Sequence, residues 1–262
     1  MITVLGAGGF IGAHLAAFLD RSGLPFQAFG REGPPPGRPL GHVVDCVGVT
    51  GDFRARPLDA VAAHVGRLPA LLDAADFESF LYLSSVRAYR GGAGPAREET
   101  PLSLDPADPD ALYDLSKAAG EALVLSLGPK GRIARLANVY GIGQRDTFLA
   151  AIIAEGKASG SLCLRSALDS EKDYVSVEDV VELLVKIALG GRRRTYNVAS
   201  GIRISHGRLV AALAQATGWR IAVAADAPSV PFPPIDVSRI REEFGFAPRN
   251  LFDALPALVA AA

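Results

Sequence analysis

The chain has 262 residues, of which 49% are hydrophobic, and its formal net charge at pH 7 is −1. The hydrophobic fraction is high enough for a large core. The near-zero net charge gives no reason to expect a protein that binds nucleic acid or a membrane surface, because such proteins carry a strong basic charge. The two cysteines and four histidines show neither a disulfide framework nor the spacing of metal ligands, so we expect no metal site.

The first predicted strand, residues 1–5, is apolar but too short for the core of a signal peptide. No later run reaches the length of about 18 apolar residues that spans a membrane. We therefore expect a cytoplasmic protein.

A glycine-rich turn follows this strand and opens into a predicted helix that ends near Ser22. Its spaced glycines, Gly6, Gly9 and Gly12, allow a tight turn, a close backbone approach to a pyrophosphate, and close packing of helix on strand. The start of the helix adds unpaired N–H groups and the positive end of its dipole. The alternative is a plain strand–helix turn. We expect a dinucleotide to contact Gly6, Gly8, Gly9, Phe10, Ile11 and Gly12.

Strands and helices then alternate along the chain, which predicts a parallel sheet with right-handed crossovers. The further predicted strands of the first half are 26–30, 42–47, 80–84 and 132–137, and its further helices are 57–76 and 111–127. The glycine- and proline-rich stretch 31–41 cannot form a helix. Beyond residue 145 we expect helices at 147–156, 176–189, 205–217 and 236–244 and strands near 162–164, 195–198 and 221–223.

The predicted fold class is therefore α/β, with a Rossmann-like, doubly wound parallel sheet. We assign residues 1–145 to the domain that binds the dinucleotide. Residues 146–262 form a smaller, substrate-binding part, which we expect to be partly interleaved with the first.

Helix 57–76 carries more apolar residues than one contact with a sheet requires, and these are Leu58, Val61, Ala62, Val65, Leu68, Leu71 and Leu72. One interpretation is deep burial within the monomer. We favour a homodimer, in which helices 57–76 and 111–127 of each subunit form the interface.

Tyr113 and Lys117 are four residues apart in the predicted helix 111–127, a spacing that puts both side chains on one face. A lysine ammonium beside a phenol favours the phenolate, so we expect Lys117 to lower the pKa of Tyr113 from its usual value of about 10. Such a tyrosine exchanges a proton near neutral pH, as the interconversion of an alcohol and a ketone requires. Taken alone, the pair also occurs by chance on amphipathic helices.

Five segments in chain order resemble the extended short-chain dehydrogenase/reductase family, in its NAD-dependent epimerase/dehydratase branch that acts on nucleotide sugars. Residues 6–12 match its G-x-x-G-x-x-G, and residues 83–89, LSSVRAY, resemble its S-S-x-x-V-Y-G. Residues 135–141, RLANVYG, are similar to R-x-x-N-V-Y-G. Residues 172–179, KDYVSVED, resemble R-D-Y/F-I-H-V-x-D, and residues 195–200, TYNVAS, resemble a later Y-N-V-G strand.

The resemblance implies a role for each matching residue. Ser85 takes the place of the catalytic Ser/Thr and holds the reacting hydroxyl or ketone. Tyr113 is the acid/base, and Lys117 holds the nicotinamide ribose and tunes the tyrosine. Asn138 approaches the substrate, and Lys172 takes the place of an arginine on its diphosphate. The expected substrate contacts are Ser85, Val86, Arg87, Asn138 and Lys172.

One departure from the family bears on the reaction. Dehydratases of the family place an Asp-Glu pair directly after the catalytic Ser/Thr, and this chain has Val86 and Arg87 there. Since neither residue can act as the acid that expels a hydroxyl, we do not expect a 4,6-dehydratase.

A second departure bears on the cofactor. Members that prefer NAD end the second strand with an acidic residue, and this chain has Arg31 there. Because an arginine suits a 2′-phosphate, we expect NADP rather than NAD, although Arg31 facing only solvent is the alternative. Val47 and Gly48, with Tyr113 and Lys117, complete the expected cofactor contacts. Family members also fit a helix and a strand where this chain has residues 31–41, so we expect a sheet one strand short.

The reaction that the resemblance implies is hydride transfer at a carbinol or ketone of a nucleotide-linked sugar, in a 4-epimerase or a 4-ketoreductase. The alternative class is a non-catalytic dinucleotide sensor or scaffold on the same fold. Retention of both Tyr113 and Lys117 favours an enzyme.

Overall fold

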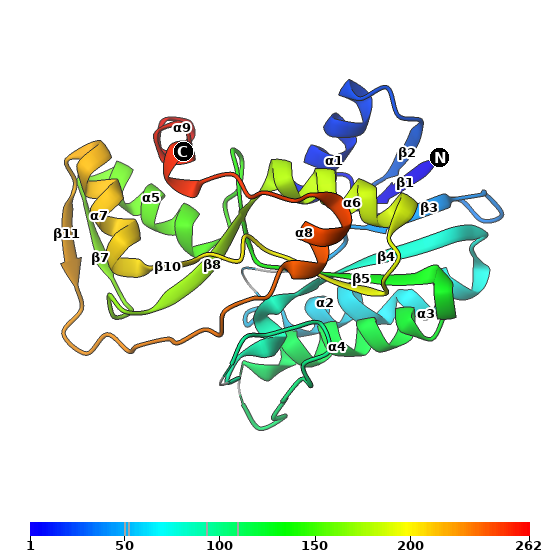
Figure 1. The fold of residues 1–262 in the computed structure, drawn as a ribbon, viewed down its shortest axis with the longest axis horizontal. Coiled ribbons are helices and arrows are strands. Elements are labelled where there is room, and N and C mark those ends of the chain that lie inside the picture. The colour runs from blue at the N-terminus through cyan, green and yellow to red at the C-terminus, as the bar shows by residue number, and fades with distance from the viewer. Residues whose placement is uncertain (50, 52, 93, 109) are drawn as a thin grey trace.

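Within the residues that the computed structural model describes, 1–49, 51, 53–92, 94–108 and 110–262, the chain folds around a six-stranded sheet (Figure 1). The strands lie in the order β2-β1-β3-β4-β5-β9, and all neighbouring pairs are parallel. Their bounds are β1 Ile2–Leu5, β2 Phe26–Phe29, β3 Gly41–Asp45, β4 Phe77–Ser85, β5 Gly131–Leu136 and β9 Thr195–Val198. The predicted α/β fold with a Rossmann-like sheet is confirmed.

Helices cover both faces of the sheet (Figure 1). Helices α1 and α6 pack together on one face, and α2, α3 and α4 lie on the other. Their bounds are α1 Phe10–Arg21, α2 Pro57–Val61, α3 Leu68–Ala74, α4 Ala111–Leu125 and α6 Val177–Gly190. In α6 the Ser176 side chain accepts a hydrogen bond from the Asp179 amide, and valines and leucines recur around the helix, which explains its start and its deep burial.

The single helix predicted over residues 57–76 is wrong. Helix α2 passes into a π-helical turn, Ala62–Gly66, before α3 begins. The Arg67 amide bonds back to the Ala62 carbonyl at 3.2 Å, five residues earlier. Pro69 lies in the first turn of α3, where its missing N–H is tolerated, whereas in a continuous helix it would break the hydrogen-bond ladder.

Strand β2 is an edge of the sheet, because residues 30–40, all of them described, form neither helix nor strand. The expected shortening of the sheet is therefore confirmed. Residues 30–40 are held against the sheet by hydrogen bonds. The Leu40 amide donates to the Asp76 carbonyl at 2.8 Å, and the Gln27 side chain donates to the Pro39 carbonyl at 3.0 Å. Arg38 donates to the Gln27 side chain at 2.5 Å.

The C-terminal half contributes both to the central sheet, through β9, and to a separate lobe. Sheets β10-β8-β6 and β11-β7 make up the strands of the lobe. The bounds of its elements are β6 Asn138–Tyr140, α5 Phe148–Ser159, β7 Ser161–Leu164, β8 Glu171–Ser176, β10 Arg203–Ser205, α7 His206–Thr217, β11 Arg220–Val223 and α9 Leu251–Ala261, and α8 Ser238–Phe244 lies against β9. Strands β6, β8 and β10 and helix α9 were not predicted. The division at residue 145 stays a prediction.

None of the helices within the described residues is long and apolar enough to cross a membrane.

Candidate active site

The turn between β1 and α1 depends on its glycines. Gly6 has φ of +74°, in the left-handed region, and accepts a hydrogen bond from the Gly9 amide at 3.0 Å. A Cβ atom on Gly12 would lie 2.2 Å from the Gly6 carbonyl oxygen, so no other residue fits there. A Cβ atom on Gly8 would meet nothing within 4 Å. Among the described residues no side chain caps the first turn of α1, and this open, N–H-rich turn fits the phosphates of a dinucleotide.

Ser85 and Tyr113 meet at the carboxyl end of β4. Ser85 ends this strand and Tyr113 lies in the first turn of α4, and the Ser85 hydroxyl is close enough to the phenol to lower its pKa. The Ser85 hydroxyl oxygen also accepts from the Arg87 amide at 3.1 Å, which fixes its position at the start of a 3₁₀ turn. A hydroxyl and a phenol held together in this way can share an oxygen atom of a substrate and exchange a proton with it.

Tyr113 is only 6% exposed. Its ring lies 5.1 Å from the Phe53 ring and 5.2 Å from the His64 ring, which it meets edge-on. Burial raises the pKa of Tyr113 to about 12, and the nearby Ser85 hydroxyl opposes this rise. The sequence predicted a pKa lowered by Lys117. In the structure burial outweighs the lowering effects of Ser85 and Arg87, so this expectation is wrong for the chain by itself.

Lys117 lies between the ends of β3 and β4. Its ammonium donates to the Leu83 carbonyl at 2.9 Å and lies 5.0 Å from the centre of the Tyr82 ring. Burial lowers the pKa of Lys117 to about 8, while the buried Asp45 carboxylate acts in the opposite direction. A Cβ atom on Gly48 would lie 3.3 Å from the ammonium. The structure therefore brings two of the predicted cofactor residues, Lys117 and Gly48, side by side.

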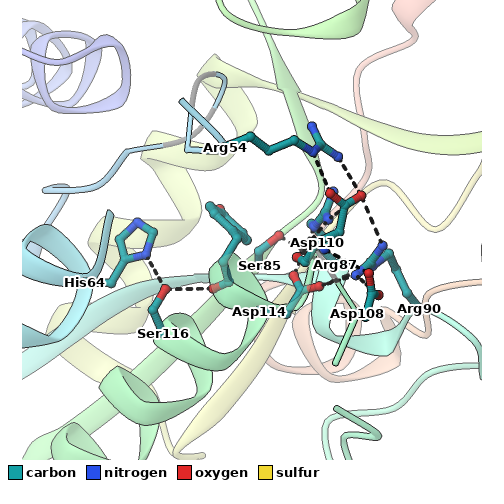
Figure 2. A network of polar contacts seen from close by, with 10 residues as sticks. Arg54, His64, Ser85, Arg87, Arg90, Asp108, Asp110, Asp114 and Ser116 are labelled. Atoms are coloured by element: carbon teal, nitrogen blue, oxygen red, sulfur yellow. Dashed lines mark hydrogen bonds and ion pairs between the residues drawn. The ribbon is translucent and has the colours of Figure 1, made fainter. Parts of the chain in front are cut away.

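A network of arginines and aspartates lies near Ser85, at the start of α4 (Figure 2). The Asp114 carboxylate, 2% exposed, accepts from Arg87 at 3.0 Å and from Arg90 at 2.8 Å. Arg54 forms a two-pronged contact with Asp110 at 2.5 and 2.6 Å, which lowers the pKa of Asp110 to about 2. Both acids lie at the start of α4, where the helix dipole favours negative charge.

The guanidinium of Arg87 connects this network to the reacting pair. It lies 5.2 Å from the centre of the Phe53 ring and 5.8 Å from that of Tyr113. Sequence reasoning missed Arg54, Arg90, Asp110, Asp114, Phe53 and His64. The one local signal was the acid directly after Tyr113, and the other residues converge only through the fold.

Two of the residues expected to contact the substrate, Asn138 and Lys172, come from the lobe. The Asn138 side chain on β6 donates to the Asp173 carbonyl at 2.9 Å. The Lys172 ammonium on β8 lies 5.1 Å from the centre of the Phe148 ring, and burial and then the charge of Arg87 lower its pKa. Two cations, Lys172 and Arg87, therefore influence each other across the junction of the central sheet and the lobe, an arrangement that suits an anionic ligand.

Two predicted contacts are not brought to this cluster. Val86 is 3% exposed and packs in the main core, so its side chain faces away from the open site. Arg31 lies exposed in the segment after β2. Within the described residues, no group of His, Cys, Asp and Glu side chains is placed to hold a metal ion.

Comparison with known proteins shows relatives of several activities. The chain is 29% identical over 229 residues to GDP-6-deoxy-D-mannose reductase of Pseudomonas aeruginosa, with 76% of this chain and 74% of that protein covered. It is 29% identical over 220 residues to dTDP-glucose 4,6-dehydratase of Streptomyces griseus, with 76% of this chain and 64% of that protein covered. The names of both relatives describe reactions of nucleotide sugars, a reduction for the first and a dehydration for the second.

The fold is shared with solved structures. RMD from Pseudomonas aeruginosa, solved in complex with NADPH, superimposes with a TM-score of 0.80 at 24% identity, covering 100% of this chain and 98% of that one. The family model for the NAD dependent epimerase/dehydratase family matches residues 37–199, more than half of the chain. The chain therefore belongs to the NAD dependent epimerase/dehydratase family.

Proposed function

We propose that this protein is an NAD(P)-dependent oxidoreductase that reduces a ketone of a nucleotide-linked sugar to an alcohol, as a 4-ketoreductase. The observation that carries the proposal is the convergence of Ser85 and Tyr113, whose side chains lie close enough to interact, with the Lys117 ammonium and Gly48 at the neighbouring strand end. Ser85 holds the substrate oxygen and Tyr113 gives it a proton.

The protonation of Tyr113 supports the reductive direction. With a pKa of about 12 the phenol carries its proton at neutral pH, which suits donation to a carbonyl oxygen. A 4-epimerase must first take a proton from an alcohol, and for that the tyrosine has to start as the phenolate. The 4-epimerase is the second candidate, because the positive charge of a bound oxidised nicotinamide would favour the phenolate that it needs.

When bound, the nicotinamide dinucleotide supplies the hydride. Gly6, Gly8, Gly9, Phe10, Ile11 and Gly12 would hold its phosphates, and Val47, Gly48, Tyr113 and Lys117 would hold its nicotinamide end. No acidic residue ends β2, and Arg31 follows it, which supports NADP rather than NAD.

The two cations at the junction support a phosphate-bearing substrate. Lys172 is paired with an aromatic ring and feels the charge of Arg87, so a diphosphate would relieve the repulsion between them. We propose Lys172, Arg87, Asn138 and Ser85 as substrate contacts. Val86, predicted as a fifth, would contribute at most its backbone.

Dehydration is not proposed, although one relative is a dehydratase. The two positions after Ser85 hold a buried valine and an arginine that is paired with Asp114, so neither offers an acid beside the reacting carbon. A dehydrating enzyme needs such an acid to expel the hydroxyl.

The test is to supply NADPH with GDP-, dTDP- and UDP-linked 4-keto sugars and follow its oxidation. The expected result is one NADPH consumed for each alcohol formed, with the Tyr113→Phe variant inactive. Conversion of a nucleotide sugar to its epimer with only catalytic NAD⁺ would replace the reductase by the 4-epimerase. Dinucleotide binding without turnover of any sugar would favour a sensor or scaffold.

We further propose a homodimer formed by helices α2–α3 and α4. Leu58 on α2 is 82% exposed and Leu112 on α4 is 38% exposed, and the two helices pack against each other. Light scattering of the wild type and of Leu58→Glu tests this: we expect a dimer that the variant weakens, whereas a monomeric wild type would contradict it.

The expected cytoplasmic location stays a prediction.

A further inference from the structure

His64 is a fully buried side chain that the proposed reaction does not use. It lies in the π-helical turn Ala62–Gly66, and its exposed fraction is 0%. Its own carbonyl, released from the regular helix pattern, accepts a hydrogen bond from the Tyr82 hydroxyl at 3.1 Å. The imidazole meets the Tyr113 ring edge-on at 5.2 Å. A polar ring placed here must satisfy both of its nitrogens inside the protein.

The ring bridges two segments. Its Nδ1 atom lies 2.8 Å from the Ser116 hydroxyl oxygen on α4 (Figure 2), and its Nε2 atom lies 3.2 Å from the Val49 amide nitrogen and 3.1 Å from the Val49 carbonyl oxygen. The Ser116 hydroxyl donates to the Tyr113 carbonyl at 2.9 Å. Since that hydroxyl has a single proton, its oxygen is left to accept a hydrogen bond from Nδ1–H of His64.

This assignment fixes the tautomer. With the proton on Nδ1, Nε2 has a lone pair and accepts from the Val49 N–H. The other tautomer would donate to the Val49 carbonyl and leave that N–H without a partner, and unpaired buried N–H groups are rarer than unpaired carbonyls. Burial and the nearby Lys117 charge lower the pKa of His64 to about 3, which keeps the ring neutral.

The bridge ends beside the proposed cofactor contacts. A Cβ atom on Gly48 would lie 3.3 Å from the Lys117 ammonium and 3.5 Å from Nε2 of His64, so the Gly48–Val49 segment rests against both side chains. The other end of the bridge is Ser116, one residue before Lys117 and three after Tyr113. One imidazole thus ties the segment after β3 to the turn of α4 that carries both residues.

We propose that His64 is a positioning residue. It holds the Gly48–Val49 segment at a fixed distance from Tyr113 and Lys117, so that this segment and these two side chains can contact the nicotinamide end of the cofactor at the same time. This inference rests on the proposed function. His64 touches neither the substrate oxygen nor the reacting hydroxyls, so it acts on cofactor affinity through Val49.

Two variants separate the ends of the bridge. In His64→Asn the amide can still reach Ser116 but is too short for Val49, whereas in His64→Gln the amide oxygen can take the place of Nε2 and accept from Val49. We expect the asparagine variant to raise the dissociation constant for NADPH by about tenfold, the effect of one lost hydrogen bond. The glutamine variant should keep the wild-type dissociation constant within about threefold. In the asparagine variant, KM for the cofactor should rise more than kcat falls.

The matched control is His42→Asn, at the opposite end of β3, where the ring bonds to Ser79 at 2.9 Å. It should leave the dissociation constant unchanged. A folded His64→Asn protein that binds NADPH as the wild type does would overturn the proposal, as would equal losses in the asparagine and glutamine variants.

The tautomer of His64 and the exchange of the Val49 amide can be measured on the wild-type protein, so this test does not depend on a variant that folds. Nitrogen NMR shifts should show His64 protonated at Nδ1 alone, and the Val49 amide should exchange slowly with solvent. Protonation at Nε2, or a Val49 amide that exchanges as an exposed one does, would overturn the proposal. Wild-type protein that binds no dinucleotide overturns the proposed function and this role with it. In contrast, normal binding with the wrong tautomer overturns the positioning role alone.

Discussion

The two ends of the proposed dinucleotide site are built differently. At the nicotinamide end, Tyr113, Lys117 and His64 are all buried, and they are held by contacts from β4, α4 and the segment after β3. At the adenine end, β2 is an edge strand and the segment after it, with Arg31, is exposed and bonds back mainly through its own backbone and Gln27. The glycine turn lies between these two ends.

This contrast separates chemistry from selectivity. A proton must be delivered to within hydrogen-bonding distance, so the reacting end requires side chains that cannot move. An adenine ribose needs only a favourable charge and an accessible surface. Substitutions at the nicotinamide end should therefore change rates strongly, and those at the adenine end should shift preference weakly.

The largest expected effect is at Tyr113. The Tyr113→Phe variant lacks the hydroxyl that lies next to Ser85, so kcat should fall by about a thousandfold, as expected for loss of a positioned acid. NADPH affinity should change little, because the ring and its contacts with Phe53 and His64 remain. Steady-state kinetics and a binding titration measure the two quantities. More than a tenth of the wild-type kcat in the variant would show that another group gives the proton.

The glycine turn between β1 and α1 should not tolerate a side chain at Gly12 but should tolerate one at Gly8. In Gly12→Ala the added methyl would press against the Gly6 carbonyl, and the free energy of unfolding should fall by about 1–3 kcal/mol. The matched variant Gly8→Ala meets nothing within 4 Å and should leave stability unchanged. Urea denaturation compares them, and equal losses in both variants would contradict the close packing of α1 on β1.

A smaller effect concerns the charge of Lys117. Because burial lowers its pKa to about 8, the ammonium is present below pH 8 and is lost as the pH rises through that value. NADPH affinity of the free protein should then fall above pH 8, by at most about tenfold for each pH unit. Lys117→Arg keeps its charge and should show no such fall. A wild-type affinity that is constant from pH 6 to 10 would exclude an ammonium contact.

The smallest effect should come from the adenine end. Arg31→Ala removes an exposed charge, which contributes little in water, so the NADPH dissociation constant should rise by about fivefold while that for NADH stays constant. Parallel titrations with the two dinucleotides give the ratio. A loss of the same size for both would mean that Arg31 does not recognise the 2′-phosphate.

Features set by neighbouring residues in the chain could be predicted from the sequence. The glycine turn follows from the spacing of Gly6, Gly9 and Gly12, and the edge position of β2 follows from the glycines and prolines of 31–41, which leave no room for another strand. Both are local matters of backbone conformation and length, and the structure has them as expected.

Features set by packing could not be predicted. Nothing near His64 indicates that its ring reaches Ser116, 52 residues later, or that Arg87 and Arg90 share Asp114. The pKa expectation for Tyr113 failed for the same reason. The spacing of Tyr113 and Lys117 gives their common face, but burial decides the pKa, and burial depends on the whole fold.

The central claim is that Tyr113 gives a proton to a sugar ketone while a nicotinamide gives the hydride. The most direct measurement is mass spectrometry of the product formed from NADPH that carries deuterium at the transferred position. The account predicts one deuterium on the new carbinol carbon for each molecule of alcohol, and almost none formed by Tyr113→Phe. A product without deuterium, or product formation that needs no NADPH, would contradict it.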